Sequence, residues 1–357
     1  MLLSIPSSSL VLLQLACAGL GAAVALPSKR AVVPPVADHD KARQVKEAFA
    51  ISWNGYYKHA FPHDTFHPVT NGYEDDRAAW GVTVVDALST AIVMNSLDIV
   101  QPMLDHIAKI DFTTTAASNY GVSLFETNIR YLGGLLSGEF VCTSRQINTP
   151  MKEKNKRYGE DGYDLLTGPY KKLGATTQQV DTLLKQAQSL ADSLSIAFDT
   201  PSGIPDGTVF LNPTRKHSNS AQNNIAEVGT LVLEWTRLSD LTGNETYAKL
   251  IEKAQNYLLH PTGSPEAWPG LVGTFVSTKN GSFLDSSGGW GGGDDSFYEY
   301  LIKMYVYDPE AYGEYKDRWV KAVDSTIDHL LSHPTSRKDL TFLSGYNGKK
   351  THPSSGH

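Results

Sequence analysis

The stretch GVSLFETNIRYLGGLL (Gly121–Leu136) decides the fold class, because it is apolar over most of its helical circumference. A helix that is hydrophobic all round lies inside other helices rather than on a surface. Residues 221–235 have the same character. Two enclosed helices among many amphipathic ones predict concentric layers, an all-α toroid of the α/α type.

Helical periodicity extends along most of the chain. It predicts helices at residues 38–60, 79–96, 97–110, 122–138, 176–198, 221–242, 245–259, 295–306 and 310–332. Short extended or turn-rich pieces lie between them, and no run of strands alternates with helices, which argues against a doubly wound parallel sheet. No linker divides the region from residue 38 to residue 357, so we expect one domain there.

The N-terminal residues are typical of a secretory signal. An apolar run from Leu10 to Leu26 ends in small residues, Ala23-Val24-Ala25, which fit an A-x-A cleavage site. We therefore expect a cleaved signal at residues 1–25 and a short propeptide or linker at 26–37. The expected location is secreted or in the secretory pathway, with an uncleaved signal anchor in the endoplasmic reticulum or Golgi lumen as the alternative.

The cysteines and the glycosylation sequons bear on the same pathway. Cys17 lies within the signal and Cys142 is the only other cysteine, so the mature chain forms no internal disulfide. That is unusual for a secreted enzyme of this size. Asn244-Glu-Thr and Asn280-Gly-Ser are acceptor sequences for N-glycosylation in that pathway.

The net charge of −7 argues against a nucleic-acid partner, which needs a concentrated basic surface. We also expect no stable membrane association and a monomer. The sequence contains no G-x-S-x-G elbow, no H-E-x-x-H, no phosphate-binding P-loop and no EF-hand loop. No residue is predicted from the sequence to bind a metal ion.

Acidic residues on apolar helices are the informative feature of the chain. Glu126 and Glu227 each enter an apolar helix, and Asp295 follows the glycine-rich stretch 288–293. Each has a structural alternative: an i,i+4 ion pair of Glu126 with Arg130, a favourable charge of Glu227 at a helix N-terminus, and a helix cap at residues 294–299. The cap is either a Ser296–Glu299 capping box or a cap by Asp294 or Asp295.

Together these acids favour a carbohydrate site. Enclosed carboxylates have shifted pKa values, and glycosidases separate an acid from a base in this way. Sugar rings stack on flat aromatic faces, for which the candidates are Trp53, Tyr56, Tyr57, Trp80, Trp268 and Trp290.

Four long motifs extend this interpretation. They are WGVTVVDALSTAIVM (80–94), VSLFETNIRYLGGLLSGEF (122–140), IAEVGTLVLEWTRLSDLTG (225–243) and GGGDDSFYEYLIK (291–303). In order and spacing they resemble the class I α-1,2-mannosidases of glycoside hydrolase family 47, most closely the secreted fungal members. The resemblance implies an (α/α)7 barrel that removes terminal α-1,2-linked mannose from high-mannose N-glycans with inversion, using Ca²⁺.

The resemblance also implies roles for residues. Glu126 matches the general acid, which acts through a water molecule, and Asp295 matches the second essential acid. Four further residues match the lining of the sugar pocket, and we expect them to bind substrate: Asp86, Arg130, Glu227 and Glu299.

Three departures from the family pattern matter. Ser89 stands where the D-x-L-D-T pattern has its second aspartate, and Gly293 stands where endoplasmic-reticulum members carry arginine, which suggests an open pocket that trims several mannoses. The R-P-E segment with the usual general base and the Ca²⁺-binding threonine are not found. The expectation is therefore an incomplete barrel without its C-terminal hairpins and little activity for these 357 residues, with a non-catalytic glycan-binding protein or an inactive fragment as alternatives.

Overall fold

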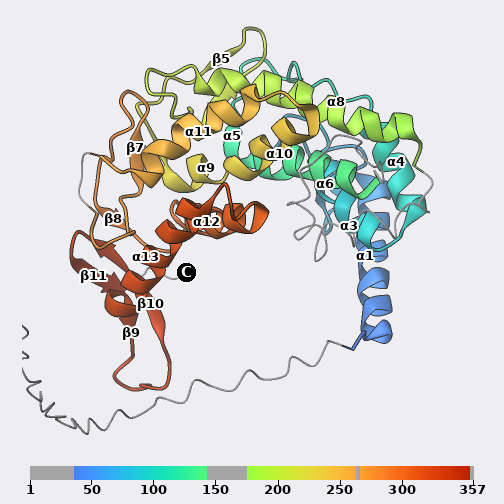
Figure 1. Ribbon diagram of the computed structural model, residues 1–357. Coiled ribbons are helices and arrows are strands. Elements are labelled where there is room, and N and C mark those ends of the chain that lie inside the picture. The colour runs from blue at the N-terminus through green and yellow to red at the C-terminus, as the bar shows by residue number, and fades with distance from the viewer. Residues whose placement is uncertain (1–35, 143–174, 263–265, 354–357) are drawn as a thin grey trace, which may run out of the picture. The chain divides into compact units, whose positions relative to one another are not determined.

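The computed structural model describes residues 36–142, 175–262 and 266–353 (Figure 1). The chain divides into two compact units, residues 1–45 and 46–357. The described part of the first unit leads into helix α1 (His39–His59). The expected signal and most of the expected linker lie outside the described residues.

Helices make up most of the second unit, as the periodicity predicts. They are α2 (Val82–Asp86), α3 (Leu88–Val93), α4 (Leu97–Ile107), α5 (Leu124–Thr127), the π-helical turn η1 (Asn128–Leu132), α6 (Gly133–Cys142), α8 (Thr177–Leu194), the 3₁₀ turn η5 (Ser195–Phe198), α9 (Ile225–Gly229), α10 (Val232–Thr242), α11 (Thr246–Leu259), α12 (Asp295–Tyr307) and α13 (Gly313–His329). The two enclosed helices start two to four residues later than expected and are interrupted, one by η1 and the other between α9 and α10.

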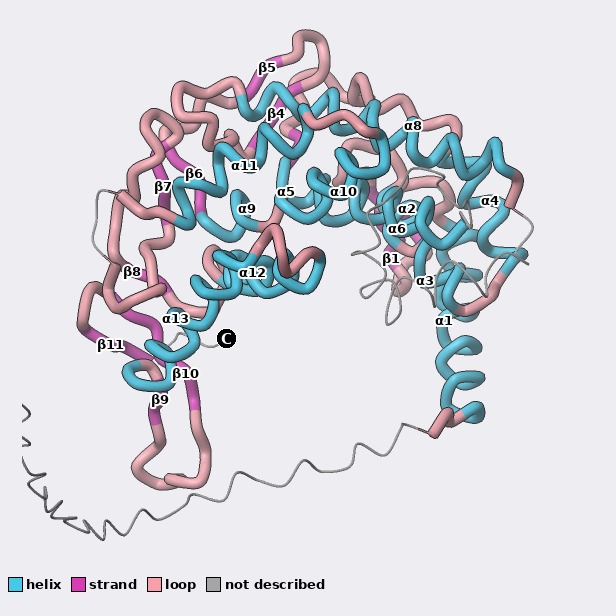
Figure 2. Tube along the Cα trace, viewed as in Figure 1, coloured by secondary structure: helices cyan, strands magenta, loops and turns pink. Residues whose placement is uncertain are grey.

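The helices of this unit form two layers (Figure 2). Helix α6 packs on α8, α10 on α11 and α12 on α13, so each of these hairpins joins an inner helix to an outer one. The inner helices also contact one another, since α6 packs on α3 and α10, and α12 packs on α9 and α10. The expected layered α/α arrangement is confirmed.

Short antiparallel strands connect the hairpins. They are β1 (Thr65–His67) with β2 (Gly72–Glu74); β3 (Val122–Ser123), β4 (Thr208–Phe210) and β5 (Lys216–His217); β6 (Gln222–Asn224) with β7 (Phe275–Ser277); and β8 (Ser287–Gly288), β9 (Leu331–Ser332) and β11 (Lys350–Pro353), which all pair with β10 (Phe342–Asn347). Two of these strands run directly into inner helices, β3 into α5 and β6 into α9. The strands therefore set where these helices begin.

A fully buried carboxylate organises the loop before α2. The Oδ1 atom of Asp64 accepts hydrogen bonds from the backbone N–H groups of Gly81 at 2.7 Å and Val82 at 2.9 Å. Its Oδ2 atom accepts from the N–H groups of Arg77 and Ala79, each at 2.8 Å. Asp64 is 0% exposed, so these donors replace the water that its charge would otherwise need.

A close approach joins α6 to α2. A Cβ atom at Gly134 would lie 2.7 Å from the carbonyl oxygen of Val85, which is shorter than real contacts allow. Gly134 is the second residue of α6, and its lack of a side chain lets α6 and α2 touch through their backbones.

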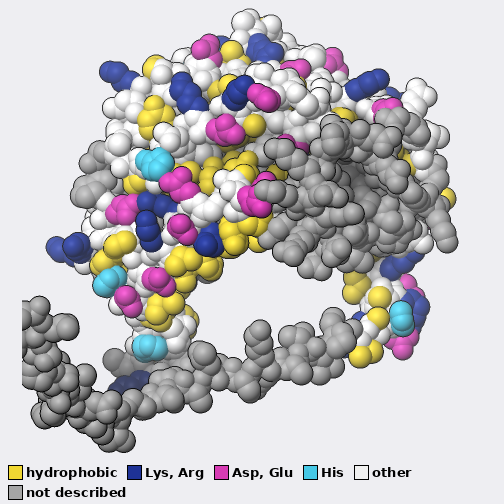
Figure 3. All heavy atoms as spheres, viewed as in Figure 1, with side chains coloured by type: hydrophobic (Ala, Val, Ile, Leu, Met, Phe, Trp, Pro, Cys, Tyr) yellow, Lys and Arg dark blue, Asp and Glu magenta, His cyan; other side chains and the backbone are white. Residues whose placement is uncertain are grey.

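Hydrophobic side chains also gather on the surface near the end of the chain (Figure 3). On α12, α13 and β10, Val306 is 54% exposed, Ile327 56% and Phe342 54%. Among the described residues, no helix combines the length and the apolar character that a membrane crossing requires.

Candidate active site

Two strand-to-helix junctions place Glu126 and Glu227 in equivalent positions. Each is the third residue of its helix, and its backbone N–H donates to the capping side chain, Ser123 Oγ at 3.2 Å for Glu126 and Asn224 Oδ1 at 2.9 Å for Glu227. Ser and Asn are strong N-cap residues, so the local sequence fixes both helix starts.

The loop at Gly207 shows that the two junctions are neighbours. The carbonyl of Gly207 accepts from the Leu124 N–H at 2.9 Å, two residues before Glu126. A Cβ atom at Gly207 would lie 2.7 Å from Glu227 Oε2, so the Glu227 carboxylate lies against the same glycine. The loop at Gly207 therefore contacts both the start of the helix that carries Glu126 and the side chain of Glu227.

Arg130 links Glu126 to Asp86. Its Nε donates to Glu126 Oε2 at 2.6 Å and its Nη1 donates to Asp86 Oδ2 at 3.2 Å. The hydrogen bond to Glu126 is the chief reason that the pKa of Arg130 is raised above its usual range. The expected i,i+4 ion pair is confirmed, and the guanidinium holds two expected site residues together.

Glu227 is half-buried and lies in a negative environment. Burial raises the pKa of its carboxyl, the hydrogen bond from Asn224 opposes this, and the charges of Glu126 and Asp206 add to the rise. Proton transfer at neutral pH is easier for a carboxyl shifted in this direction. The shift also shows that Glu227 lies within electrostatic reach of Glu126.

Helix α12 joins the site through α9. The Ala226 N–H donates to the Gly293 carbonyl at 3.0 Å, and Thr230 Oγ1 donates to Ser296 Oγ at 2.7 Å. These bonds place the first turn of α12, with exposed Asp295, beside the helix that carries Glu227.

Of the two alternatives predicted for the cap of α12, the capping box is wrong. The helix begins at Asp295, so Ser296 lies inside it and is not its N-cap. Glu299 forms an ion pair with Lys303 Nζ at 2.6 Å and its side chain is 55% exposed. The Ser296–Glu299 capping box is therefore absent, and Asp294 takes the N-cap position without a hydrogen bond from its side chain to the helix.

The structure directly joins Asp86, Arg130 and Glu126 and brings Glu227 beside them. Asp295 and Glu299 lie on the adjoining helix α12. Their catalytic and binding roles stay predictions.

Asp294 is a buried acid that sequence reasoning treated only as a cap. It is 6% exposed, and its Oδ1 atom has no hydrogen-bond partner. Burial raises the pKa of this carboxyl to about 7, and the charges of Asp285 and Asp295 add to the rise. Hydrogen bonds from Thr274 and Gly289 oppose the rise, but burial outweighs them because it removes water from the charged form.

We expect Asp294→Asn to stabilise the fold at pH 8 by about 3 kcal/mol, because it removes a carboxylate that ionises inside the protein. Between about pH 4 and pH 7 the folded wild type holds a proton that the unfolded chain has released, so its stability falls as pH rises. Urea unfolding at pH 4 to 8 should show that the free energy of unfolding falls less with rising pH in the variant than in the wild type.

The matched control for Asp294→Asn is Asp285→Asn. Asp285 accepts from the backbone N–H groups of Thr274, Phe275 and Ser287, so its charge is well solvated by the protein. We expect this substitution to destabilise the fold at pH 8. Equal effects of the two substitutions would contradict the account of Asp294.

The aromatic residues expected to stack on sugars mostly belong to the core. Trp53, Tyr56 and Trp80 are 3% to 5% exposed and pack on other aromatic rings. Trp290 stacks on Tyr298 and donates to Thr326 Oγ1 at 2.8 Å. Trp268 stacks on His329, whereas Tyr57 is exposed. The expectation is wrong for the buried three because their faces are already covered by protein.

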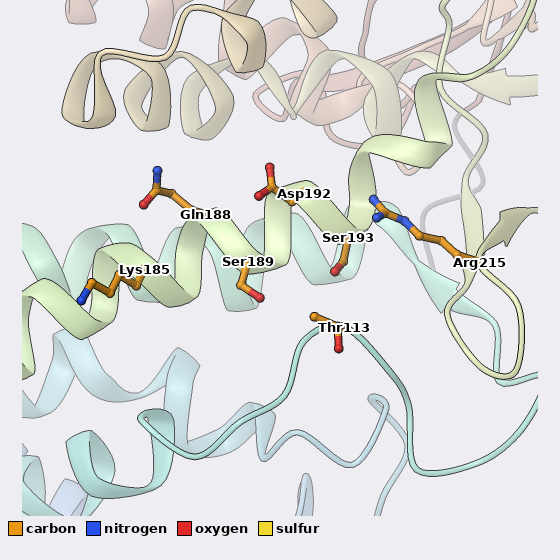
Figure 4. Close-up of a pocket in the computed structure, with 7 residues that line it drawn as sticks. All are labelled: Thr113, Lys185, Gln188, Ser189, Asp192, Ser193 and Arg215. Carbon is orange, nitrogen blue, oxygen red and sulfur yellow. The ribbon is translucent and has the colours of Figure 1, made fainter.

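A polar groove follows the outer helix α8 (Figure 4). Lys185, Ser189 and Asp192 of α8 line it, together with Thr113 and Arg215 from two loops. None of the expected site residues lines this groove. The candidate active site is therefore a separate feature on the inner helices.

The described residues hold no cluster of metal-binding side chains and expose the asparagines of both glycosylation sequons. Within residues 36–142, 175–262 and 266–353, no three His, Cys, Asp or Glu side chains lie close enough to hold a metal ion. Both sequon asparagines, Asn244 and Asn280, are exposed. The Oδ1 atom of Asn280 accepts from Ser282 Oγ at 2.8 Å. Glycosylation of both stays a prediction.

Known proteins share this sequence and fold. The profile of glycosyl hydrolase family 47 matches residues 48–357. The probable mannosyl-oligosaccharide alpha-1,2-mannosidase 1B of Aspergillus clavatus is 50% identical over 350 residues, which cover 97% of this chain and 62% of that protein. The mannosyl-oligosaccharide alpha-1,2-mannosidase of Penicillium citrinum is 51% identical over 324 residues, which cover 90% and 58%.

A solved structure agrees with these relatives. The alpha-1,2-mannosidase from Trichoderma reesei superimposes with a TM-score of 0.80 at 56% identity, covering 89% of this chain and 60% of that one. This similarity confirms the α/α-barrel fold class. The chain spans about three fifths of the length of the relatives that it matches.

Proposed function

The chain belongs to glycosyl hydrolase family 47, and from that premise we propose that it acts as a mannosyl-oligosaccharide α-1,2-mannosidase. The substrate is the terminal α-1,2-linked mannose of high-mannose N-glycans, and the reaction inverts the anomeric centre. The observation that carries the proposal is the joined set of Glu126, Arg130 and Asp86 beside Glu227, because it combines two carboxylates in different electrostatic environments.

Glu126 is the general acid of this proposal. It delivers a proton to the departing glycosidic oxygen through a water molecule, so that the oxygen leaves as a neutral hydroxyl. Arg130 lies 2.6 Å from the Glu126 carboxylate and holds its orientation. An oriented acid is effective because the proton acceptor must lie within hydrogen-bond reach, directly or through one water.

The remaining predicted residues bind and orient the sugar. Asp295 is the second essential acid, and the exposed carboxylates of Asp86 and Glu299 can accept hydrogen bonds from mannose hydroxyls. Glu227 is more readily protonated than an ordinary carboxyl, so it can donate a hydrogen bond as well as accept one. Inverting enzymes generally separate their two carboxyl groups by about 6.5 to 9.5 Å to admit a water.

Calcium is proposed because of the family and not because of a metal site in the structure. The described residues contain no cluster of three metal-binding side chains, and the Glu126 carboxylate is held by Arg130. The described residues by themselves do not fit a calcium site, so no step is routed through the ion. Calcium dependence is therefore a matter for measurement.

The function is tested by the release of free mannose from α-1,2-mannobiose and from a high-mannose glycan. Each assay is run with added Ca²⁺ and with a chelator, beside an α-1,6-linked mannobiose as the matched control. We expect whatever mannose these 357 residues release to come from the α-1,2-linked substrates alone, because the family relatives are α-1,2-mannosidases by name. Glycan binding without release would support the glycan-binding alternative. The absence of both binding and release would overturn the proposal.

Location and partners follow from the same proposal. A secreted or secretory-pathway protein meets N-glycans, and glycosylation at Asn244 and Asn280 would accompany that route. The endoplasmic reticulum or Golgi lumen is the alternative location. The high-mannose N-glycan is the proposed partner of a monomeric protein without nucleic-acid or stable membrane partners.

A further inference from the structure

Glu234 of α10 connects two segments of the candidate site. Its Oε2 accepts a hydrogen bond from Asn128 Nδ2 at 3.1 Å, and its Oε1 accepts one from Tyr300 Oη at 2.9 Å. Asn128 is the first residue of the π-helical turn η1, whereas Tyr300 belongs to α12. One partly buried carboxyl thus contacts both segments.

Both partners lie next to predicted site residues. Asn128 stands between Glu126 and Arg130, two residues from each, and Tyr300 directly follows Glu299 on the helix that begins with Asp295. A shift of Asn128 or Tyr300 would therefore move an acid-bearing backbone. Misplacing a reacting group by about 1 Å can cost about 100-fold in rate.

Both ends of the Asn128 amide have hydrogen-bond partners. Its Oδ1 accepts from Trp235 Nε1 at 3.1 Å, and its Nδ2 also donates to the Thr230 carbonyl at 3.4 Å. Asn128 and Trp235 are each 0% exposed. Because both amide hydrogens and the amide oxygen are bonded, the orientation of the amide is fixed by the residues of α10 and by Thr230 just after α9.

A carboxyl suits this position because it offers two acceptor oxygens that point to different partners. Burial raises the pKa of Glu234 to about 7, and the bonds from Tyr300 and Asn128 together with the charge of Lys303 oppose this. A neutral side chain of the same shape is therefore compatible with the site. Glutamine can accept from Asn128 and donate to Tyr300 Oη.

We propose that Glu234 is a positioning residue, which holds the segment of Glu126 and Arg130 in a fixed relation to the segment of Asp295 and Glu299 by accepting hydrogen bonds from Asn128 and Tyr300. The proposal rests on the proposed mannosidase function. It concerns a residue that acts through its neighbours and does not itself touch the sugar.

The test compares Glu234→Gln with Glu234→Leu in the full chain. We expect Glu234→Leu to lower kcat for mannose release by about 10- to 100-fold per folded molecule, with KM changed by less than about threefold. Glu234→Gln should stay within about fivefold of the wild type. Adding Tyr300→Phe to Glu234→Leu should cost little more, since their shared contact is already lost.

Asp240→Leu is the matched control. Tyr307 Oη donates to Asp240 Oδ2, so this pair bridges the same two helices, α10 and α12, away from the acids. We expect kcat within about threefold of the wild type. An equal loss in Asp240→Leu and Glu234→Leu would overturn the proposal, because general loosening of the helix pair would then explain both.

Hydrogen exchange separates failure of this proposal from failure of the proposed function. In Glu234→Leu the amides of residues 124–132 and 295–300 should both exchange faster, by about tenfold or more, whereas Asp240→Leu should leave them unchanged. This readout needs no turnover, so it still tests the connection if the wild type releases no mannose. Unchanged exchange in either segment, or an undiminished kcat in an active enzyme, would overturn it.

Discussion

Replacing Glu126 by glutamine is expected to lower kcat for mannose release by about 100- to 10 000-fold, which is the usual contribution of a general acid. Glutamine keeps the shape of the side chain, and its carbonyl oxygen can still accept from Arg130 Nε, which lies 2.6 Å from Glu126 Oε2. The substitution therefore removes the proton and leaves the surrounding geometry. Initial rates with α-1,2-mannobiose measure the effect.

Two comparisons sharpen this result. Glu245→Gln removes a carboxyl that pairs with Lys249 on the surface at α11, and it should leave kcat unchanged. Binding of the disaccharide to Glu126→Gln, followed by calorimetry, should stay within about tenfold of the wild type. A loss of kcat smaller than about fivefold would show that another residue delivers the proton.

Replacing Asp64 by asparagine is expected to destabilise the fold by about 3 to 5 kcal/mol, because it leaves two buried backbone donors without an acceptor at a cost of about 1 to 3 kcal/mol each. Asp64 accepts from four backbone N–H groups, and Tyr131 Oη lies 3.2 Å from its Oδ1. An amide can accept on one side only, so its NH₂ group would face two backbone donors. Guanidinium-induced unfolding of the second unit measures the loss in the free energy of unfolding.

Asp75 provides the matched control for Asp64. It also accepts from a backbone N–H, that of Asp64 at 3.2 Å, but its side chain is 33% exposed. Water can solvate the amide of Asp75→Asn, so this substitution should cost less than about 1 kcal/mol. If both variants unfold at the same denaturant concentration, burial is not what makes Asp64 important.

The sequence pattern anticipated the helices well, because core-facing residues recur at helical spacing in each of them. The apolar character of Gly121–Leu136 correctly indicated an inner helix. The pattern could not show that Ser123 and Asn224 act as N-caps after short strands, since an apolar residue in a strand and one in a buried helix read alike. The late starts of both inner helices have this cause.

The site was anticipated in part. Glu126 with Arg130 was visible from spacing, and Glu227 from its place in an apolar helix. Glu234 carries the same signal, an acid within the apolar run LVLEW, and it could have been found by the same reasoning. Asp64 could not, because its partners are backbone groups of a loop 13 to 18 residues away. Asp294 was hidden by its plausible role as a cap.

The π-helical turn η1 determines where an insertion or deletion can be accommodated in this helix. Such a turn is an α-helix that holds one additional residue, and each residue of a regular helix turns the chain by about 100°. A deletion within residues 128–132 would thus remove the additional residue and leave the following helix close to its present orientation. Gly134 could then stay against the backbone of Val85, where only a glycine fits. A deletion after the turn, within residues 133–136, would instead rotate the rest of the helix by about 100° and bring a side chain to that place. We therefore expect the turn, and not the helix after it, to tolerate a change of length.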